Sequence, residues 1–169
     1  FVAPGNAGTA LESKLQNVDI NADDIDALLE FAQEEKINLT IVGPEAPLCL
    51  GVVDRFNLAG LKCFGPTKGA AQLEGSKAFT KDFLARHNIP TAAYGNFTEI
   101  EAAKSYVEKV GAPIVIKADG LAAGKGVIIA QNKQQAFDAI DDMLAGNKFG
   151  EAGSRVAVSY THLTLPTNR

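Results

Sequence analysis

The feature that most constrains the fold is a long glycine-rich connection between two short β-branched runs. The runs are Ile114–Ile116 and Val127–Ile129, and their composition predicts two strands of a hairpin. The connection, Asp119–Gly126, is longer than the roughly two to five residues that a hairpin needs. We therefore expect the connection to be mobile or to bring its backbone close to a ligand.

Lysines and glycines together suggest what that ligand is. Lys117 ends the first run, and Lys125 lies among Gly120, Gly124 and Gly126. Lysine is almost never fully buried without a partner, and glycine lets the backbone approach a ligand closely. The simplest partner is an anion such as a nucleotide phosphate. The plainer alternative is a hairpin with an ordinary surface lysine at each end.

Composition excludes several other functions. The 16 Lys and Arg against 20 Asp and Glu leave a net charge of −4, which predicts no nucleic-acid partner. No apolar run approaches the roughly 20 residues that span a bilayer, so we expect no membrane partner. Cys49 and Cys63 lack CxxC spacing and stand apart from His87 and His162, which favours a reducing, cytoplasmic location without a Cys/His metal site.

Strands and helices alternate in the first half of the chain. We predict strands at 1–3, 39–42 and 62–64, and helices at 22–35, capped by Asn21, and 51–59. This order is typical of a doubly wound parallel sheet with buried strands. Its ligands bind beyond the carboxyl ends of the strands, where loops 4–9, 43–48 and 65–68 would lie. The chain opens within a strand, so we expect a missing N-terminal segment.

The second half predicts an antiparallel α+β domain. Ser76 is expected to cap a helix whose free N–H groups, beside Lys77, would favour an anion. Thr98 to Glu101 reads as a capping box for a helix through Val110. The hairpin, a helix after Asn132 and a strand at 155–158 complete the domain.

Five motifs, in one order, carry a family resemblance. They are Val2–Thr9, Val42–Leu48, Phe64–Thr67, Leu73–Phe83 and Val115–Val127. Together they closely resemble the phosphoribosylamine–glycine ligases (glycinamide ribonucleotide synthetases) of the ATP-grasp superfamily. The likeness runs from Phe1 to about Val158.

The resemblance implies an α/β fold in two parts. Residues 1–75 would form a Rossmann-like parallel sheet, the pre-ATP-grasp domain with its first strand missing. Residues 76–158 would form an α+β partial ATP-grasp domain. Residues 159–169 do not resemble the family and are interpreted as an artefactual tail.

The resemblance also implies a reaction and a set of site residues. ATP would phosphorylate glycine, and 5-phosphoribosylamine would attack the acyl phosphate to give glycinamide ribonucleotide, ADP and phosphate in purine synthesis. The residues implied to bind ATP are Lys77, Lys117, Asp119, Gly120, Gly124, Lys125 and Gly126. Those implied to bind glycine or phosphoribosylamine are Asn6, Gly43, Pro44 and Glu45.

Further expectations follow from the same resemblance. The Mg²⁺ or Mn²⁺ ligands would lie in a C-terminal part outside this sequence, and the intact enzyme would be a cytoplasmic monomer. The chain alone is expected not to catalyse. The alternatives are another ATP-grasp carboxylate–amine ligase, such as a biotin carboxylase-like enzyme, a nucleotide-binding module without turnover, and a purely structural domain.

Overall fold

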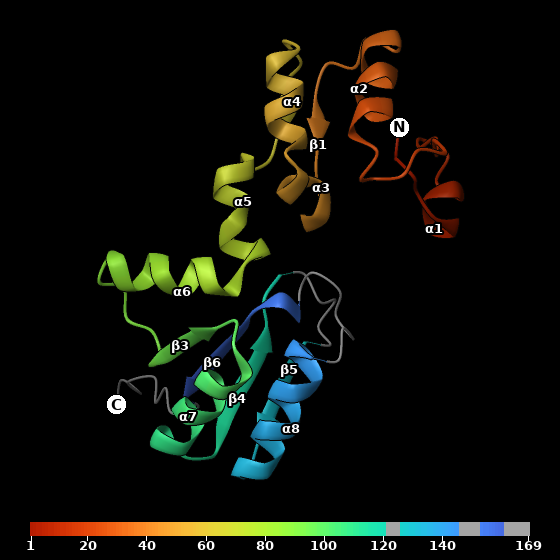
Figure 1. The fold of residues 1–169 in the computed structure, drawn as a ribbon. Helices are drawn as coiled ribbons and strands as arrows, with labels where there is room; N and C mark the ends of the chain where they lie inside the picture. Colours follow the sequence, from red (N-terminus) through yellow and green to blue (C-terminus); the bar gives the residue numbers. More distant parts are fainter. Residues whose placement is uncertain (121–125, 146–152, 161–169) are drawn as a thin grey trace, which may run out of the picture. The chain divides into compact units, whose positions relative to one another are not determined.

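The computed structural model describes residues 1–120, 126–145 and 153–160 (Figure 1). The chain divides into two compact units, Phe1–Gln72 and Leu73–Arg169. Within the described ranges, no helix has both the length and the apolar character needed to cross a bilayer.

The first unit contains the predicted parallel pairing. Strands β1 (Thr40–Ile41) and β2 (Cys63–Phe64) lie parallel, with Thr40 opposite Cys63. The helices of this part of the chain are α1 (Ala7–Ala10), α2 (Ile25–Glu34), α3 (Glu45–Leu50), α4 (Val52–Leu58) and α5 (Lys68–Gly75). The buried core consists of Ala32, Val52, Val53 and Phe56.

Two predictions for this unit are wrong in detail. Helix α2 begins at Ile25 and not at Ala22, because the Ala27 amide donates to Asp24 Oδ1 at 3.1 Å, making Asp24 the N-cap in place of Asn21. The strand at 39–42 was expected to be buried, but Leu39 and Ile41 are 54% and 70% exposed. Helices cover only part of this short sheet.

Two segments predicted as loops contain short helices. Helix α1 follows Asn6, whose side-chain oxygen accepts from the Gly8 and Thr9 amides at 2.8 and 3.0 Å. Helix α3 overlaps the predicted loop 43–48 and is followed by its C-cap Gly51, which has φ +98°. Helices this short depend on local caps more than on an apolar stripe, so periodicity does not reveal them.

The second unit is built on an antiparallel sheet. Its strands run in the order β3 (Tyr94–Phe97), β6 (Val156–Tyr160), β4 (Ile114–Ala118) and β5 (Val127–Ala130). The predicted hairpin is confirmed, with Ile114 opposite Ala130 and Lys117 opposite Val127. Strand β6 extends two residues beyond the predicted Val158, so Ser159 and Tyr160 pair with β4.

Two helices cover one face of this sheet. Helices α7 (Ile100–Val110) and α8 (Lys133–Leu144) lie side by side across it (Figure 1). Beneath them, the buried core of the unit includes Val107, Ile114, Ile116, Ile140 and Val158. The predicted helix after Asn132 is confirmed as α8, and the structure shows Asn132 to be its N-cap, since Asn132 Oδ1 accepts from the Gln135 amide at 2.9 Å.

The predicted capping box of α7 is wrong. The N-cap is Glu99, it makes no side-chain hydrogen bond, and α7 begins at Ile100. Burial of Ala103 and Val107 under the sheet provides much of what holds this helix, so its start depends less on a cap.

Helix α6 (Lys77–Arg86) lies against the opposite face of the sheet. Asn96 on β3 faces away from the core, opposite Ala157 on β6, and its Nδ2 donates to Asp82 Oδ1 of α6 at 3.0 Å. The predicted Ser76 cap is confirmed, because Ser76 Oγ accepts from the Phe79 amide at 3.1 Å.

Candidate functional site

Two of the residues predicted to bind ATP, Lys77 and Lys117, belong to α6 and to the sheet face against which α6 lies. Strand alternation sends Ile114, Ile116 and Ala118 into the core, so Val115 and Lys117 point to the other face. Antiparallel pairing places Val127 and Ile129 beside them, and these two side chains are 42% and 61% exposed. Lys117 therefore lies next to an apolar patch, which we define as the half-buried Val115 and the exposed Val127 and Ile129.

Lys77 and Lys117 belong to neighbouring parts of this face. Lys77 is the first residue of α6, and its Nζ donates to the carbonyl of Gly120 at 2.8 Å. Gly120 lies two residues beyond the end of β4, on which Lys117 is the last residue but one. The contact brings the first turn of α6 to the start of the glycine-rich connection.

Lys81 is a further cation of this site that the sequence reasoning missed. Burial, and then repulsion from Lys117, lower the pKa of Lys81. Its Nζ donates to Thr91 Oγ1 at 2.6 Å and to the Ala92 carbonyl at 3.2 Å, and it lies 5.5 Å from the centre of the Tyr94 ring. The available signal was spacing: Lys77 and Lys81 are four residues apart, on one side of a helix.

The described ends of the glycine-rich connection have defined backbone geometry. Gly120 has φ +82°, a conformation that glycine adopts without the steric cost of a side chain. Gly126 is buried, and its carbonyl accepts from the Ala118 amide at 2.8 Å. Gly124 and Lys125, both predicted to bind ATP, lie outside the described residues.

Asp119 joins this connection to α6. Its Oδ1 accepts from Ser76 Oγ at 3.0 Å and from the Ala78 amide at 3.1 Å. The Phe79 amide already donates to Ser76. The amides of Ala78 and Phe79 are therefore occupied, and the expectation of free N–H groups at this helix start is wrong for them.

The residues predicted to bind glycine or phosphoribosylamine lie in the first unit. Gly43 and Pro44 line a cavity of about 570 Å³, whereas Glu45 and Asn6 do not. Glu45 is the exposed first residue of α3, and Asn6 caps α1. The structure therefore brings only Gly43 and Pro44 to one cavity.

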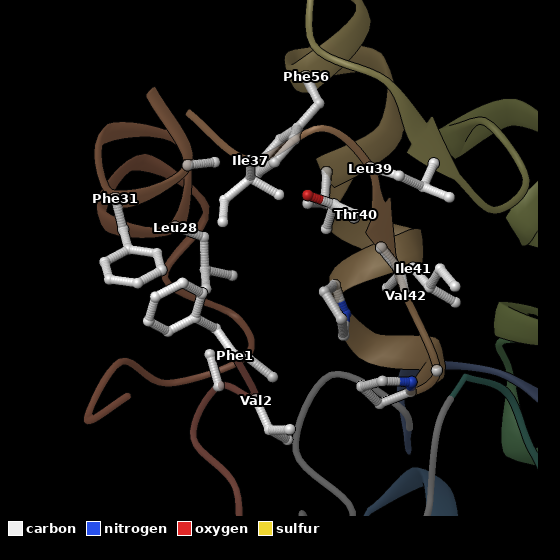
Figure 2. Close-up of a pocket in the computed structure, with 17 residues that line it drawn as sticks. Phe1, Val2, Leu28, Phe31, Ile37, Leu39, Thr40, Ile41, Val42 and Phe56 are labelled. Carbon is white, nitrogen blue, oxygen red and sulfur yellow. The ribbon is translucent and has the colours of Figure 1, made fainter. Parts of the chain in front are cut away.

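The lining of this cavity is chemically apolar. Figure 2 shows side chains of Phe1, Leu28 and Phe31 from one side and of Thr40 and Val42 from the other. Burying a phosphate or a carboxylate among such groups is costly unless the charge is paired. Binding of a phosphorylated substrate deep in this space is not favoured by its lining.

No group of three or more His, Cys, Asp or Glu side chains that could hold a metal ion occurs among the described residues. The described part of the chain therefore does not fit a divalent metal centre by itself. Cys49 and Cys63 are both free thiols.

Two family models match consecutive parts of the chain. Residues 1–74 match the phosphoribosylglycinamide synthetase N domain. Residues 75–161 match the phosphoribosylglycinamide synthetase ATP-grasp (A) domain. The second match includes Ser159 and Tyr160, so the family likeness extends beyond Val158, where it was expected to end.

Curated relatives and solved structures agree with these models. The phosphoribosylamine–glycine ligase of Vibrio cholerae is 75% identical over 158 residues, which are 94% of this chain and 37% of the relative. The crystal structure of the Thermotoga maritima phosphoribosylamine–glycine ligase superposes with a TM-score of 0.75 at 28% identity, over 95% of this chain and 37% of that one.

A more distant structure shares the fold. The biotin carboxylase domain of the Hydrogenobacter thermophilus 2-oxoglutarate carboxylase, solved with MgADP, ADP and bicarbonate, has a TM-score of 0.69 at 19% identity. The superposed region covers 86% of this chain and 33% of the Hydrogenobacter thermophilus chain. The chain thus spans little more than a third of the length of the curated relatives it matches.

Proposed function

Because the chain belongs to the phosphoribosylglycinamide synthetase family, we propose that it supplies phosphate-binding lysines to an ATP-dependent carbon–nitrogen ligase. In the proposed reaction, the γ-phosphoryl group of ATP passes to the glycine carboxylate, and ADP leaves. The amine of 5-phosphoribosylamine then attacks the acyl carbon, and phosphate leaves as glycinamide ribonucleotide forms. The observation that carries the proposal is the contact of Lys77 with Gly120, two residues past β4.

The lysines act by position and charge. Phosphoryl transfer depends mostly on holding the phosphates in line and neutralising their developing charge. Lys77 and Lys117 would contact the phosphates, with the backbone of Gly120 and Gly126 close to them. The apolar patch of Val115, Val127 and Ile129 offers a surface beside Lys117 for the flat base of the nucleotide.

Substrate and metal assignments belong to the same proposal. Asn6, Gly43, Pro44 and Glu45 are proposed to contact glycine or phosphoribosylamine near the surface of the first unit. Mg²⁺ or Mn²⁺ would neutralise phosphate charge when bound, with ligands drawn from outside the described residues. We also propose a cytoplasmic, monomeric enzyme, in keeping with its free cysteines.

Lys117 provides the test. Because the chain spans 37% of its Vibrio cholerae relative, the assay uses a full-length hybrid in which this chain replaces the matching region. The hybrid should release ADP only when glycine and 5-phosphoribosylamine are both present. Lys117→Ala should lower kcat/KM by about a hundredfold or more, as loss of one transition-state charge contact does.

A matched variant separates charge from folding. Lys133→Ala removes a lysine that pairs with Glu108 on the helix-covered side of the same unit, and it should leave turnover unchanged. ATP binding without glycine-dependent turnover would support a binding module. Turnover with a different carboxylate would support another ATP-grasp ligase, and full activity of Lys117→Ala would contradict the assigned site.

A further inference from the structure

Asp119 uses both carboxylate oxygens to join two elements that are distant in sequence. Oδ1 accepts from Ser76 Oγ and from the Ala78 amide, while Oδ2 lies 3.1 Å from Ser76 Oγ and 3.9 Å from Arg155 Nη1. The Asp119 amide donates to the Arg155 carbonyl at 2.9 Å. The side chain is only 15% exposed, so these partners surround it.

This carboxylate occupies the place that a ligand anion would take at the start of a helix. The second and third amides of α6, those of Ala78 and Phe79, donate to Asp119 and Ser76. Negative charge at this end also stabilises α6 through the helix dipole. A phosphate at the site is therefore left to bind side-chain cations, and not these two amides.

The two lysines flank the contact on both sides. Lys77 lies between Ser76 and Ala78, the two partners of Asp119, and Lys117 precedes Asp119 by two residues on β4. Lys77 Nζ reaches the carbonyl of Gly120, the residue after Asp119. The spacing between the lysine backbones is thus fixed where β4 meets α6, at the Asp119 carboxylate.

We propose that Asp119 is a positioning residue. It holds Lys77 and Lys117 at the distance from each other that the phosphates of a nucleoside triphosphate require, and it does not itself contact the nucleotide. The proposal rests on the proposed function and sharpens the role of Asp119 from a direct ATP contact to an anchor. Its carboxylate accepts hydrogen bonds from Ser76 and Ala78 and pairs with Arg155. In this proposal the carboxylate therefore faces these groups and not the phosphates that the lysines bind.

The test compares anchor variants in the full-length hybrid by the KM for ATP, the KM for glycine, and the Kd for ATP with Mg²⁺. Asp119→Ala should raise the KM and the Kd for ATP at least about tenfold, the factor expected from losing a hydrogen bond to a charged group. The KM for glycine should stay unchanged. Asp119→Asn keeps one oxygen acceptor for the Ala78 amide and should recover much of the ATP affinity.

Two further variants separate positioning from stability. Asp141→Ala removes a carboxylate that pairs with Lys104 at 2.7 Å between α7 and α8, and it should change neither KM. Ser76→Ala should weaken ATP binding in the same direction as Asp119→Ala, and should add little to it in the double variant. If Asp119→Ala does not fold, the KM and the Kd for ATP are compared between Ser76→Ala, Asp119→Asn and the unchanged hybrid.

Equal changes in both KM values, or no change in ATP affinity, would overturn the positioning role. So would fully additive effects of Ser76→Ala and Asp119→Ala on the Kd for ATP. A hybrid that binds ATP but never turns over glycine would overturn the proposed function alone, because the Kd comparison still tests Asp119.

Discussion

Lys81 shows how one residue reports on the charge of its surroundings. Its ammonium donates to Thr91 and Ala92 and stays partly buried beside Lys117. Burial and the neighbouring positive charge both disfavour its protonated form, so its pKa lies below the ordinary 10.5. The unfolded chain then binds this proton more tightly than the folded chain. Charged Lys81 therefore destabilises the folded state, and this penalty is lost, so that stability rises, as the pH rises from the lowered pKa toward 10.5.

A bound nucleotide should reverse this shift. Phosphate oxygens placed between Lys81 and Lys117 would stabilise both ammonium groups, so ATP should raise the pKa of Lys81. The measurement is an NMR titration of the lysine side chains with and without ATP. Lys117→Met should raise the pKa of Lys81 in the ligand-free protein, because it removes the repulsion. If ATP leaves the pKa of Lys81 unchanged, the phosphates do not bind between Lys81 and Lys117.

Single elements of this chain depend on their ends. Helices α3 and α4 meet at Gly51, which ends the first and begins the second with φ +98° and ψ +30°. Its amide donates to the carbonyls of Pro47 and Leu48, both at 3.1 Å. This left-handed turn allows two short helices to follow each other directly while Val52, Val53 and Phe56 stay buried.

Gly51→Ala should therefore lower the free energy of unfolding by about 1–2 kcal/mol, the cost of a left-handed conformation for a residue with a side chain. The new Cβ would lie 3.3 Å from Lys68 Cδ, a flexible atom that can move away, so backbone strain should dominate. Gly69→Ala in helix α5, with open space around its Cβ, should be neutral or stabilise by up to about 1 kcal/mol. Urea unfolding measures both, and an equal loss in the two variants would contradict the role of the turn.

At the scale of the whole molecule, each unit carries its own core. One buried cluster draws on residues from Ala32 to Phe56, and the other on residues from Ala103 to Val158. Phe56 and Ile116, at 1% and 0% exposure, are central to their respective clusters. Among the residues that the structure describes, neither cluster includes a residue of the other unit.

Phe56→Ala and Ile116→Ala should each destabilise mainly the unit that contains it. Truncation of a buried phenylalanine or isoleucine costs about 2–5 kcal/mol in lost contacts and residual cavity. Residue-resolved hydrogen exchange should show faster exchange in residues 1–72 for the first variant and in residues 73–160 for the second. Equal acceleration of both units by either variant would show that they unfold as one.

Much of the second unit could be predicted because its determinants are local. Alternation placed Lys117 and Ile116 on opposite faces of one strand, and Ser76 was recognisable as a cap at the start of a helix. The first unit was harder. Helix α3 was read as a loop, and the strand at 39–42 was expected to be buried, although Leu39 and Ile41 are exposed. Short elements depend on neighbours that spacing does not reveal.

The candidate site also contains some residues that the sequence predicts and others that only the structure reveals. Lys77, Lys117 and Gly120 stood out in sequence because lysines beside glycines favour phosphate. The anchoring contact of Asp119 did not, since Asp119 and Ser76 are 43 residues apart and nothing in their spacing joins them. Lys81 was missed for the same reason, because its partners Thr91 and Ala92 come from a different segment.

The sequence by itself determined the family, the hairpin and the lysines, because these follow from residue type, alternation and the order of motifs along the chain. Only the tertiary structure decided which donors remain for a ligand. Asp119 accepts from the amide of Ala78, and Ser76 accepts from that of Phe79. Burial, and then repulsion from Lys117, lower the pKa of Lys81. The physical reason is that hydrogen bonds and charge repulsion depend on distances in space, which folding sets between residues that the chain keeps far apart.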